Sequence, residues 1–479
     1  MIAGSRDSPA QRAFLEISEA LANGSFRPGE QLPSIRQWAS RPGLSFHGVV
    51  RAYERLEALG RVVANPGRGY FMAAQGMAVE GIAQEGVAAE GMAGERADLS
   101  MATPPPRAST EMNPFWALFH ASGTSMKLGC GWLPPEWTDT RSLARVIRRT
   151  ATFARSSLVE YGDPAGYLPM REALACHLRG RHCLPVTASN ILTTLGATQA
   201  LDLIIRLLVL PGDRVLVDDP CNSNLIRLLQ LRGAEVIGIT RLNDGPDLDA
   251  VAARLQEGPV RAFFINARLH NPTGTSVSPR QACSLLRLSA AHGMLLVEDD
   301  VYGDFCSGPA HHLASLSGLT NVVYVGSFSK TLSANLRVGY VAAPSALIAR
   351  LADLKLLTSV AVPGFCERFI GAILSDGSYE RHVRKARLRL QTAQADTRAA
   401  LERWGWELYH TPREGMFVWV RHPRLACTRG LIEAALAHQV LLAPGRLFSA
   451  DGRETPWLRI NVAHFDLARA QAVFAAFVD

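Results

Sequence analysis

The stretch that decides the fold is VYVGSFSKTLSANLRVGY, residues 323–340. It opens with an apolar, β-branched run that is typical of a buried strand. Ser327 comes next, then Lys330, and Arg337 follows seven residues after the lysine. A lysine forms a Schiff base when its amine is held beside a carbonyl and is partly unprotonated. A phosphate dianion needs hydroxyl donors and a guanidinium. Both requirements are met within eleven residues, which predicts a site for pyridoxal 5'-phosphate (PLP), although a solvated loop lysine is the simpler alternative.

Two further segments favour the PLP site. Asp299 follows the apolar run MLLV, and a buried carboxylate is what keeps the PLP pyridine nitrogen protonated. Asn271 lies in HNPTG, residues 270–274, where its amide can bond the phenolic oxygen of the ring. Taken alone, HNPTG indicates only a turn.

A third segment, LGATQALDLI at 195–204, places Ala197, Thr198 and Gln199 where a loop passes into a helix. Free backbone N–H groups at such a junction bind phosphate. An ordinary capped helix remains an equally good interpretation of this segment by itself.

Strand-like runs alternate with helical stretches from about residue 113 to 479. DRVLVDD, AEVIGIT, RAFFINA, MLLVEDD and NVVYVGSFS are short and apolar, and amphipathic segments such as RQACSLLRLSAAHG lie between some of them. This alternation predicts an α/β domain with a mainly parallel sheet. The candidate residues follow strands, at the carboxyl ends where ligands bind in such folds.

In order and spacing, these segments resemble the fold-type I PLP-dependent aminotransferases over about residues 113–479. The resemblance implies a smaller C-terminal α+β subdomain from about residue 365. It implies that Lys330 holds PLP covalently, that Tyr302 bonds the phenolic oxygen, and that Arg459 binds the α-carboxylate of an amino compound. A strand-borne surface arginine is the alternative for Arg459.

The same resemblance implies that Ser327 and Arg337 hold the phosphate together with the 197–199 turn. Tyr161, in YGDPAGY, would reach the phosphate of a neighbouring subunit, so a homodimer is expected. The sequence departs from the family at Asn222, where an aromatic residue usually stacks on the ring, and at Glu414, where a glycine is usual. The carboxylate of Glu414 could disfavour acidic ligands.

Residues 1–74 form a separate basic unit. They hold nine arginines, no lysine and six acidic residues, a net charge of +3. Ser34 and Ser45 are placed to cap two helices, and Val49, Tyr53, Leu56 and Leu59 keep helical spacing in the second. RVVANPGRGYFM then predicts a hairpin around Asn65-Pro66-Gly67. A small helical domain that binds another protein would fit these features as well.

LPSIR, RAYERLEALG and PGRGYF resemble the winged helix-turn-helix of the GntR regulators. The resemblance places helix 45–59 in the major groove of double-stranded promoter DNA. The residues expected at the DNA are Arg36, Ser45, His47, Arg51 and, on the wing, Arg68. Phe46 and Gly48 depart from the polar residues usual in this helix, which could change the operator sequence or weaken binding. With the aminotransferase-like domain, the whole chain resembles MocR-type regulators.

Between the two units, residues 75–112 contain a five-residue repeat, QGMAVEGIAQEGVAAEGMAGER, followed by ATPPPRAST. Regular glycines and the prolines disfavour a helix, so we expect a flexible linker. The N-terminus lacks a signal pattern and no run is long enough for a membrane span, so a cytoplasmic protein is expected. Cys176-His177 with His182-Cys183 matches no usual zinc spacing, and we therefore predict no metal.

Two functions stay open at this point. The chain could be a transcription regulator that senses PLP or a small amino compound, or a working aminotransferase that transfers an amino group to a 2-oxo acid. A sugar- or nucleotide-binding α/β protein is a poor third, because no P-loop or dinucleotide fingerprint occurs.

Overall fold

The structure is a computed structural model that describes residues 9–23, 26–58, 61–65, 69–73, 125–152, 159–308 and 313–475. The chain divides into two compact units, Met1–Ala102 and Thr103–Asp479. The linker predicted at 75–112 lies outside the described residues, as do Leu59, Arg68 and the turn Pro66-Gly67. The expected boundaries at 74 and 112 therefore stay predictions.

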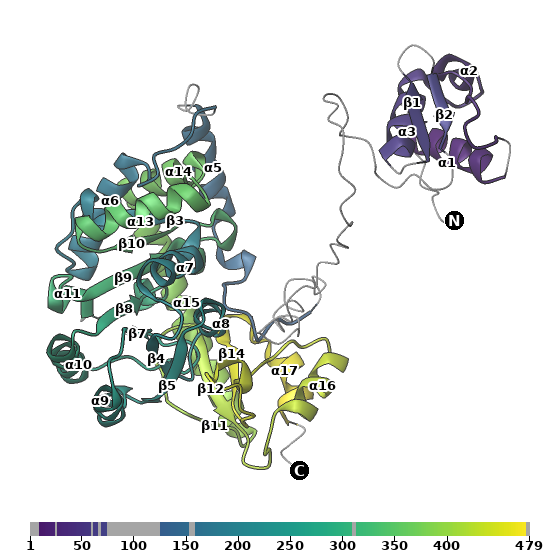
Figure 1. Ribbon diagram of the computed structural model, residues 1–479. Helices are drawn as coiled ribbons and strands as arrows, with labels where there is room; N and C mark the ends of the chain where they lie inside the picture. Colours follow the sequence, from purple (N-terminus) through teal and green to yellow (C-terminus); the bar gives the residue numbers. More distant parts are fainter. Residues whose placement is uncertain are drawn as a thin grey trace, which may run out of the picture. The chain divides into compact units, whose positions relative to one another are not determined.

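The N-terminal unit is a three-helix domain with a two-stranded wing (Figure 1). Its elements are α1 (Pro9–Ala22), α2 (Ile35–Ala39), α3 (Phe46–Ala58), β1 (Val62–Asn65) and β2 (Gly69–Met72). The two strands pair antiparallel, with Val62 opposite Met72 and Asn65 opposite Gly69. The predicted helices and hairpin strands are therefore present.

Both predicted caps occur in this unit. Ser34 and Gln37 form a capping box at the start of α2, and Ser45 Oγ accepts a 3.1 Å hydrogen bond from the Gly48 amide at the start of α3. Such caps stabilise a helix by about 1 kcal/mol each. The buried face of α3 includes Val49, Tyr53 and Leu56, as the periodicity predicts. The opposite face of α3, with Arg51 and Glu54, is exposed.

The large unit is built on an eight-stranded sheet in the order β3-β10-β9-β8-β7-β4-β5-β6. The strands in that order are β3 (Ile191–Thr194), β10 (Gly339–Ala342), β9 (Val322–Ser327), β8 (Leu295–Asp299), β7 (Ala262–Ile265), β4 (Arg214–Asp219), β5 (Glu235–Leu242) and β6 (Gly245–Pro246). The pairs between β9 and β5 are parallel, whereas β10 runs antiparallel to both its neighbours. The predicted mainly parallel sheet is confirmed, and each predicted strand run is a strand.

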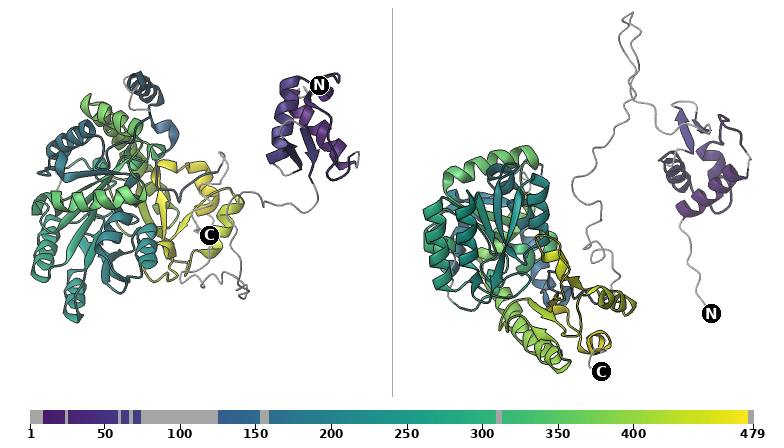
Figure 2. Two further views of the ribbon diagram at one scale, coloured as in Figure 1. Left: turned by 45° about the horizontal axis from the view of Figure 1, so that its top comes forward. Right: turned by 60° about the horizontal axis from the view of Figure 1, so that its bottom comes forward.

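Apolar side chains project from both faces of this sheet, because successive residues of a strand point to opposite sides. In β4, Val215 and Val217 join one hydrophobic cluster and Leu216 joins the other. Helices therefore cover both faces (Figures 1 and 2). One face packs on α7 (Gly196–Leu208), α8 (Ser223–Arg232) and α13 (Ser345–Thr358). The other packs on α6 (Leu168–His182), α9 (Leu248–Glu257), α10 (Pro279–His292), α11 (Leu313–Ser317) and α14 (Gly364–Ser375).

The C-terminal part forms a second, smaller layer, as the family resemblance implies, although α14, at its expected start, packs on the large sheet. Its four-stranded antiparallel sheet has the order β11-β12-β14-β13. The long helix α15 (Ser378–Arg403) leads into it, and the remaining elements are β11 (Glu407–Leu408), β12 (Phe417–Arg421), α16 (Arg429–Ala437), β13 (Ala443–Pro444), β14 (Leu458–Asn461) and α17 (Leu467–Phe474). Strand β14 carries Arg459, so this layer contributes a charged side chain to the site described below.

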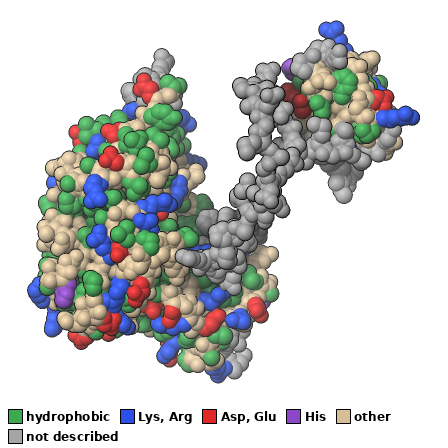
Figure 3. Space-filling view, viewed as in Figure 1, with side chains coloured by type: hydrophobic (Ala, Val, Ile, Leu, Met, Phe, Trp, Pro, Cys, Tyr) green, Lys and Arg blue, Asp and Glu red, His purple; other side chains and the backbone are tan. Residues whose placement is uncertain are grey.

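Charged side chains on the large unit are mixed in sign on the face shown in Figure 3. All eight cysteines are free thiols. Among the described residues, none of the helices is long and apolar enough to cross a lipid bilayer.

Candidate functional site

Lys330 lies on the short helix α12 (Phe328–Thr331), directly after β9. Ser327 caps this helix, because its Oγ accepts a 3.1 Å hydrogen bond from the Ser329 amide. Burial, and then the positive charge of Arg459, lower the pKa of the Lys330 amine to about 8. An amine with such a pKa is partly neutral near neutral pH and can attack an aldehyde.

A cavity of about 220 Å³ opens beside the Lys330 side chain. It is lined by Gly131, Trp132, Ala197, Thr198, Leu201, Asn222, Ser223, Asn224, Asn266, Asn271, Asp299, Val301, Tyr302, Lys330, Phe448 and Arg459. Seven residues that the sequence singled out for the cofactor or its ligand therefore meet in one place: Lys330, Asp299, Tyr302, Asn271, Ala197, Thr198 and Arg459.

Asp299 ends β8 and is buried in the wall of the cavity. Burial raises the pKa of its carboxyl group to about 7, against a 3.3 Å hydrogen bond from the Val301 amide that lowers it. The Asn266 side chain holds the Asp299 backbone carbonyl at 2.6 Å. A carboxyl group so desolvated is one that a cationic ring nitrogen would stabilise in its charged form.

Two hydrogen-bond donors face the same space from different loops. Asn271 uses its Oδ1 to accept a bond from Arg459, which leaves its Nδ2 as a donor. A methyl group placed on Gly131 would lie 3.6 Å from both Tyr302 Oη and Lys330 Nζ. The absent side chain of Gly131 therefore keeps open the space that the amine and the phenol share.

Arg459 is buried, and its guanidinium lies between two aromatic rings. Its Cζ is 4.5 Å from the ring centroid of Phe417 and 4.7 Å from that of Phe448. Nη1 donates to Asn271 Oδ1 and Nη2 donates to the Gly129 carbonyl, each at 2.6 Å. Burial lowers the pKa of Arg459 to about 10. The guanidinium is held rigidly at the cavity wall, which suits recognition of a carboxylate.

The N-terminus of α7 and Arg337 are in direct contact. Arg337 Nη2 donates to the Leu195 carbonyl at 3.1 Å. Gly196 has a φ of +77°, and a methyl group there would lie 2.8 Å from Arg337 Nη2. Gly339 approaches from the sheet, since a methyl group on it would lie 2.5 Å from the carbonyl carbon of Gly196. Glycine at both positions lets the arginine approach the first amides of the helix.

A buried hydroxyl at Ser329 is compatible with a phosphate ligand. Its Oγ is buried and has no hydrogen-bond partner among the described residues, although a buried hydroxyl normally has one. It is two residues from Ser327 and next to Lys330. The donor set of hydroxyl, guanidinium and helix N-terminus fits a phosphate, and the amine, carboxyl and amide groups fit the ring of PLP.

Four predicted residues do not line the cavity, among them Arg337, whose contact with the start of α7 is described above. Gln199 bonds the Leu195 amide at 2.6 Å and the Ser359 hydroxyl at 2.7 Å. Ser327 bonds the Val338 carbonyl at 3.3 Å. Tyr161 is 89% exposed, so it contributes nothing to the cavity of its own chain. Their assigned roles stay predictions.

Sequence reasoning missed Gly131, Asn266 and Phe448. Gly131 lies in a loop about 200 residues before Lys330, and nothing in its local sequence marks it. Asn266 ends the run RAFFIN after β7, at the sheet edge where ligands bind, so it could have been found. Glu414 bonds the Ser307 amide at 2.7 Å and lines a different cavity, and the effect expected from it on acidic ligands has no support here.

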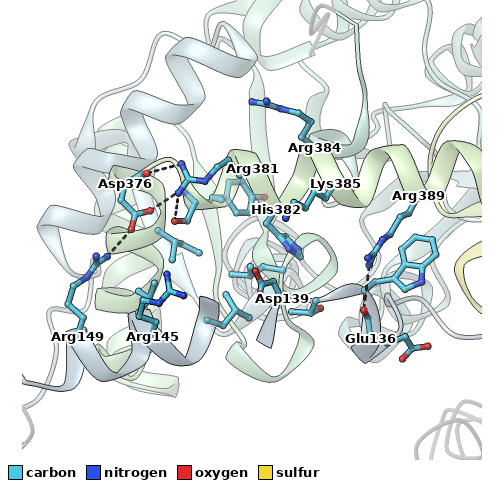
Figure 4. Close-up of a pocket in the computed structure, with 18 residues that line it drawn as sticks. Glu136, Asp139, Arg145, Arg149, Asp376, Arg381, His382, Arg384, Lys385 and Arg389 are labelled. Carbon is cyan, nitrogen blue, oxygen red and sulfur yellow. Dashed lines mark hydrogen bonds and ion pairs between the residues drawn. The ribbon is translucent and has the colours of Figure 1, made fainter. Parts of the chain in front are cut away.

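A larger cavity, of about 850 Å³, lies between α5 (Thr140–Thr152), α14 and α15 and holds none of the residues predicted for PLP. Figure 4 shows Arg149 and Arg381 turned towards Asp376 at one end of it. Its walls are rich in basic side chains. This cavity is separate from the one beside Lys330.

The expected DNA-contacting residues of the N-terminal unit are at its surface. Arg36, Ser45, His47 and Arg51 are exposed, and His47 and Arg51 are one helical turn apart on α3. Two other arginines pack on aromatic rings of the same unit: Arg41 lies over Trp38 and Arg55 lies over Phe14. Phe46 is 51% exposed at the start of α3, where it offers an apolar surface.

Known proteins resemble both units. Residues 124–477 match the family "Aminotransferase class I and II", and residues 9–72 match "Bacterial regulatory proteins, gntR family".

The similar proteins include transcriptional regulators and aminotransferases. The uncharacterized HTH-type transcriptional regulator YdcR of Escherichia coli is 29% identical over 95% of this chain and 94% of its own length. The HTH-type transcriptional regulator TauR of Rhodobacter capsulatus is 27% identical, over 94% and 92%. The 2-aminoadipate transaminase of Thermus thermophilus is 30% identical, over 69% and 83%. In structure, the multiple substrate aminotransferase of Thermococcus profundus superposes with a TM-score of 0.71 and 25% identity, over 78% of this chain and 94% of that one.

The two regulators match over more than nine tenths of this chain, whereas the two aminotransferases match over 69% and 78% of it. The chain belongs to the class I and II aminotransferase family through its large unit and to the gntR family through its N-terminal unit. This combination of domains is that of a MocR-type regulator.

Proposed function

We infer that the chain is a PLP-binding, DNA-binding transcription regulator whose aminotransferase-like unit senses PLP or a small amino compound. The observation that carries this inference is that a gntR unit and a cavity holding Lys330, Asp299 and Arg459 occur on one chain. The effector must bind two states of the protein with different affinity in order to regulate.

Each part of PLP has a matching group in the cavity. Lys330 would supply the amine for the aldehyde, and Asp299 would stabilise a protonated pyridine nitrogen. Tyr302 and Asn271 Nδ2 would donate hydrogen bonds to the phenolic oxygen. Arg337, Ser329 and the first amides of α7 would hold the phosphate, and Ser327 caps the helix that carries the lysine. When bound, PLP supplies an electron sink for bonds at the α-carbon of an amino compound.

The remaining steps are carried out by side chains of the protein. Arg459 binds a carboxylate, and its fixed position orients the ligand so that the amino group lies beside Lys330. As the neighbouring base, Lys330 accepts or returns a proton at the α-carbon. Phe417 and Phe448 exclude water from the guanidinium, which strengthens its electrostatic interaction with the ligand.

We also propose a homodimer. Tyr161 is almost fully exposed, and in a dimer its hydroxyl would reach the phosphate in the neighbouring subunit. Residues 75–112 would tether the DNA-binding unit, and the protein would act in the cytoplasm on double-stranded promoter DNA.

The test is a fluorescence-anisotropy titration of the full chain with its own upstream DNA, with and without PLP and a panel of amino acids and amines. A sequence-selective affinity that changes with PLP or with one amino compound supports a regulator. Equal affinity for the upstream fragment and for scrambled DNA at every condition contradicts it.

An active aminotransferase is the alternative. It is favoured by the simultaneous presence of Lys330, Asp299 and Arg459 in the cavity. Steady-state turnover of an amino acid with a 2-oxo acid would support it, and turnover does not exclude regulation.

A further inference from the structure

Two histidines and an aspartate converge outside the PLP cavity. His177 and His182 lie in the last two turns of α6, and Asp304 lies in the short helix η3 (Gly303–Phe305). His182 Nε2 is 2.8 Å from Asp304 Oδ1, and His177 Nε2 is 3.3 Å from the same oxygen. The three atoms lie within 4.8 Å of one another. All three side chains are largely buried.

A second carboxylate fixes the orientation of His177. Its Nδ1 lies 3.2 Å from Glu380 Oε1. A neutral imidazole that donates its Nδ1 proton to Glu380 directs the Nε2 lone pair at the Asp304 oxygen. Two lone pairs repel at 3.3 Å, so the arrangement requires a cation between them, either a proton or a metal ion.

The spacing of the atoms is close to that of a metal site. Zinc binds imidazole nitrogen and carboxylate oxygen at about 2.0–2.2 Å, so neighbouring ligand atoms of a tetrahedral site are about 3.4 Å apart. The 3.3 Å between His177 Nε2 and Asp304 Oδ1 lies near this value, and the 2.8 Å between His182 Nε2 and Asp304 Oδ1 is shorter. Because all three atoms lie within 4.8 Å of one another, small side-chain movements would bring them to bonding distance of one ion.

We propose that His177, His182 and Asp304 bind one divalent transition-metal ion, with zinc the best match, and that Glu380 positions His177 for it. Two imidazoles and a carboxylate are a common zinc donor set, whereas Mg²⁺ and Ca²⁺ prefer oxygen ligands. A carboxylate on the outer nitrogen of a ligating histidine is the usual supporting contact. Three protein ligands leave a fourth position for water.

The sequence did not predict this site, because its third ligand lies 122 residues from His182. The local pattern Cys176-His177 with His182-Cys183 matches no usual zinc spacing, and no metal was predicted from it. Both cysteines are exposed, and neither is among the converging residues.

Positive charge nearby limits the affinity. Arg387 and Arg268 both lie close enough to Asp304 to interact with its charge, although burial lowers the pKa of Arg387 overall. Removing one of these charges should strengthen metal binding. Replacing Arg387 by glutamine is therefore expected to raise metal affinity, whereas replacing a ligand is expected to lower it.

The proposed metal site is linked by hydrogen bonds to α12, the helix that carries Lys330. Asp304 Oδ2 accepts a hydrogen bond from Tyr379 Oη, and Tyr379 Oη lies 2.8 Å from Thr331 Oγ1. Thr331 is the residue after Lys330. A metal ion on Asp304 would hold this chain of contacts in one arrangement.

The experiment uses the full-length chain, stripped with a chelator, dialysed and titrated with Zn²⁺ and, separately, with Co²⁺. One zinc per chain is expected by elemental analysis. His177→Gln and His182→Gln should each lower zinc affinity at least 100-fold, and Glu380→Gln about 10- to 100-fold. Arg387→Gln should raise it. His438→Gln, at an exposed histidine, and the double variant Cys176→Ser, Cys183→Ser should bind zinc as the unaltered chain does.

The cobalt spectrum of the unaltered chain decides the question even if a ligand variant fails to fold. Strong visible bands without a thiolate charge-transfer band support the histidine and aspartate ligands. A thiolate band, less than one ion per chain at saturation, or unchanged zinc affinity in both histidine variants overturns the proposal.

Discussion

Arg459 Nη1 donates a 2.6 Å hydrogen bond to Asn271 Oδ1, across 188 residues of sequence. Asn271 comes from the loop after β7 in the large sheet, and Arg459 comes from β14 in the small one. The bond therefore joins the two layers at the cavity. It also assigns the amide of Asn271, because the oxygen is used by Arg459 and the nitrogen remains for the cofactor.

Replacing Arg459 by lysine should weaken binding of amino acids about 10- to 100-fold, since a charge-assisted bond contributes about 1.5–3 kcal/mol. The measurement is the PLP absorbance change on titration with an amino acid. The matched control is the corresponding amine without a carboxylate, whose affinity should change little. An equal loss for both compounds would contradict the carboxylate role.

Lys330→Ala should abolish the covalent attachment of PLP, and borohydride treatment followed by mass spectrometry should find no adduct on the variant. In the unaltered chain the pKa of about 8 leaves about 10% of the amine neutral at pH 7 and about 90% at pH 9. The rate of PLP loading should therefore rise about tenfold between these values. A rate that is flat or that falls over this range would argue against Lys330 as the attacking amine.

Asp299→Asn should stabilise the PLP-free chain at pH 8 and weaken PLP binding. The folded pKa of Asp299, about 7, lies above the unfolded value of about 3.9. Ionisation of Asp299 therefore costs folding stability that is absent below pH 4 and develops as the pH rises to 7. Thermal unfolding of both proteins at pH 5 and pH 8 checks this, and the gain at pH 8 should exceed that at pH 5. A variant that is less stable at pH 8 would refute it.

Asn222→Tyr should strengthen PLP binding and weaken the fold. Asn222 lines the cavity where an aromatic ring would stack on the pyridine, which contributes about 0.5–1.5 kcal/mol. Its side chain also caps α8 by accepting a 3.1 Å bond from the Asn224 amide, and loss of a cap costs about 1 kcal/mol. Equilibrium dialysis against PLP and thermal unfolding measure the two effects, and Asn222→Ala, which removes only the cap, separates them.

Arg51→Ala should lower affinity for the upstream DNA and reduce the slope of log affinity against log salt by about 1 if the guanidinium contacts a phosphate. The control is Arg350→Ala, at an exposed arginine of α13 in the large unit. Both variants should keep the thermal stability of the unaltered chain, because Arg51 makes no ion pair among the described residues. Equal DNA affinity of the two variants would remove Arg51 from the interface.

The sequence by itself determined the elements and the chemistry of the main site. Apolar runs such as MLLVEDD predicted strands because a doubly covered strand must be apolar on both faces, and β8 occupies that run. Lys330, Asp299 and Asn271 could be selected because each follows a strand, and parallel strands bring their carboxyl ends to one edge. Ser34 and Ser45 marked the starts of α2 and α3, because an N-cap is a hydrogen bond between residues close in sequence.

Only the tertiary structure decided which groups meet across layers. Gly131 opens the space beside Lys330 and Tyr302, yet a glycine in a loop carries no local signal for this. Asp304 joins His177 and His182 from more than a hundred residues away, so no spacing pattern could reveal their convergence. The shifted pKa values of Lys330 and Asp299 likewise depend on burial, which arises when distant segments pack together and exclude water.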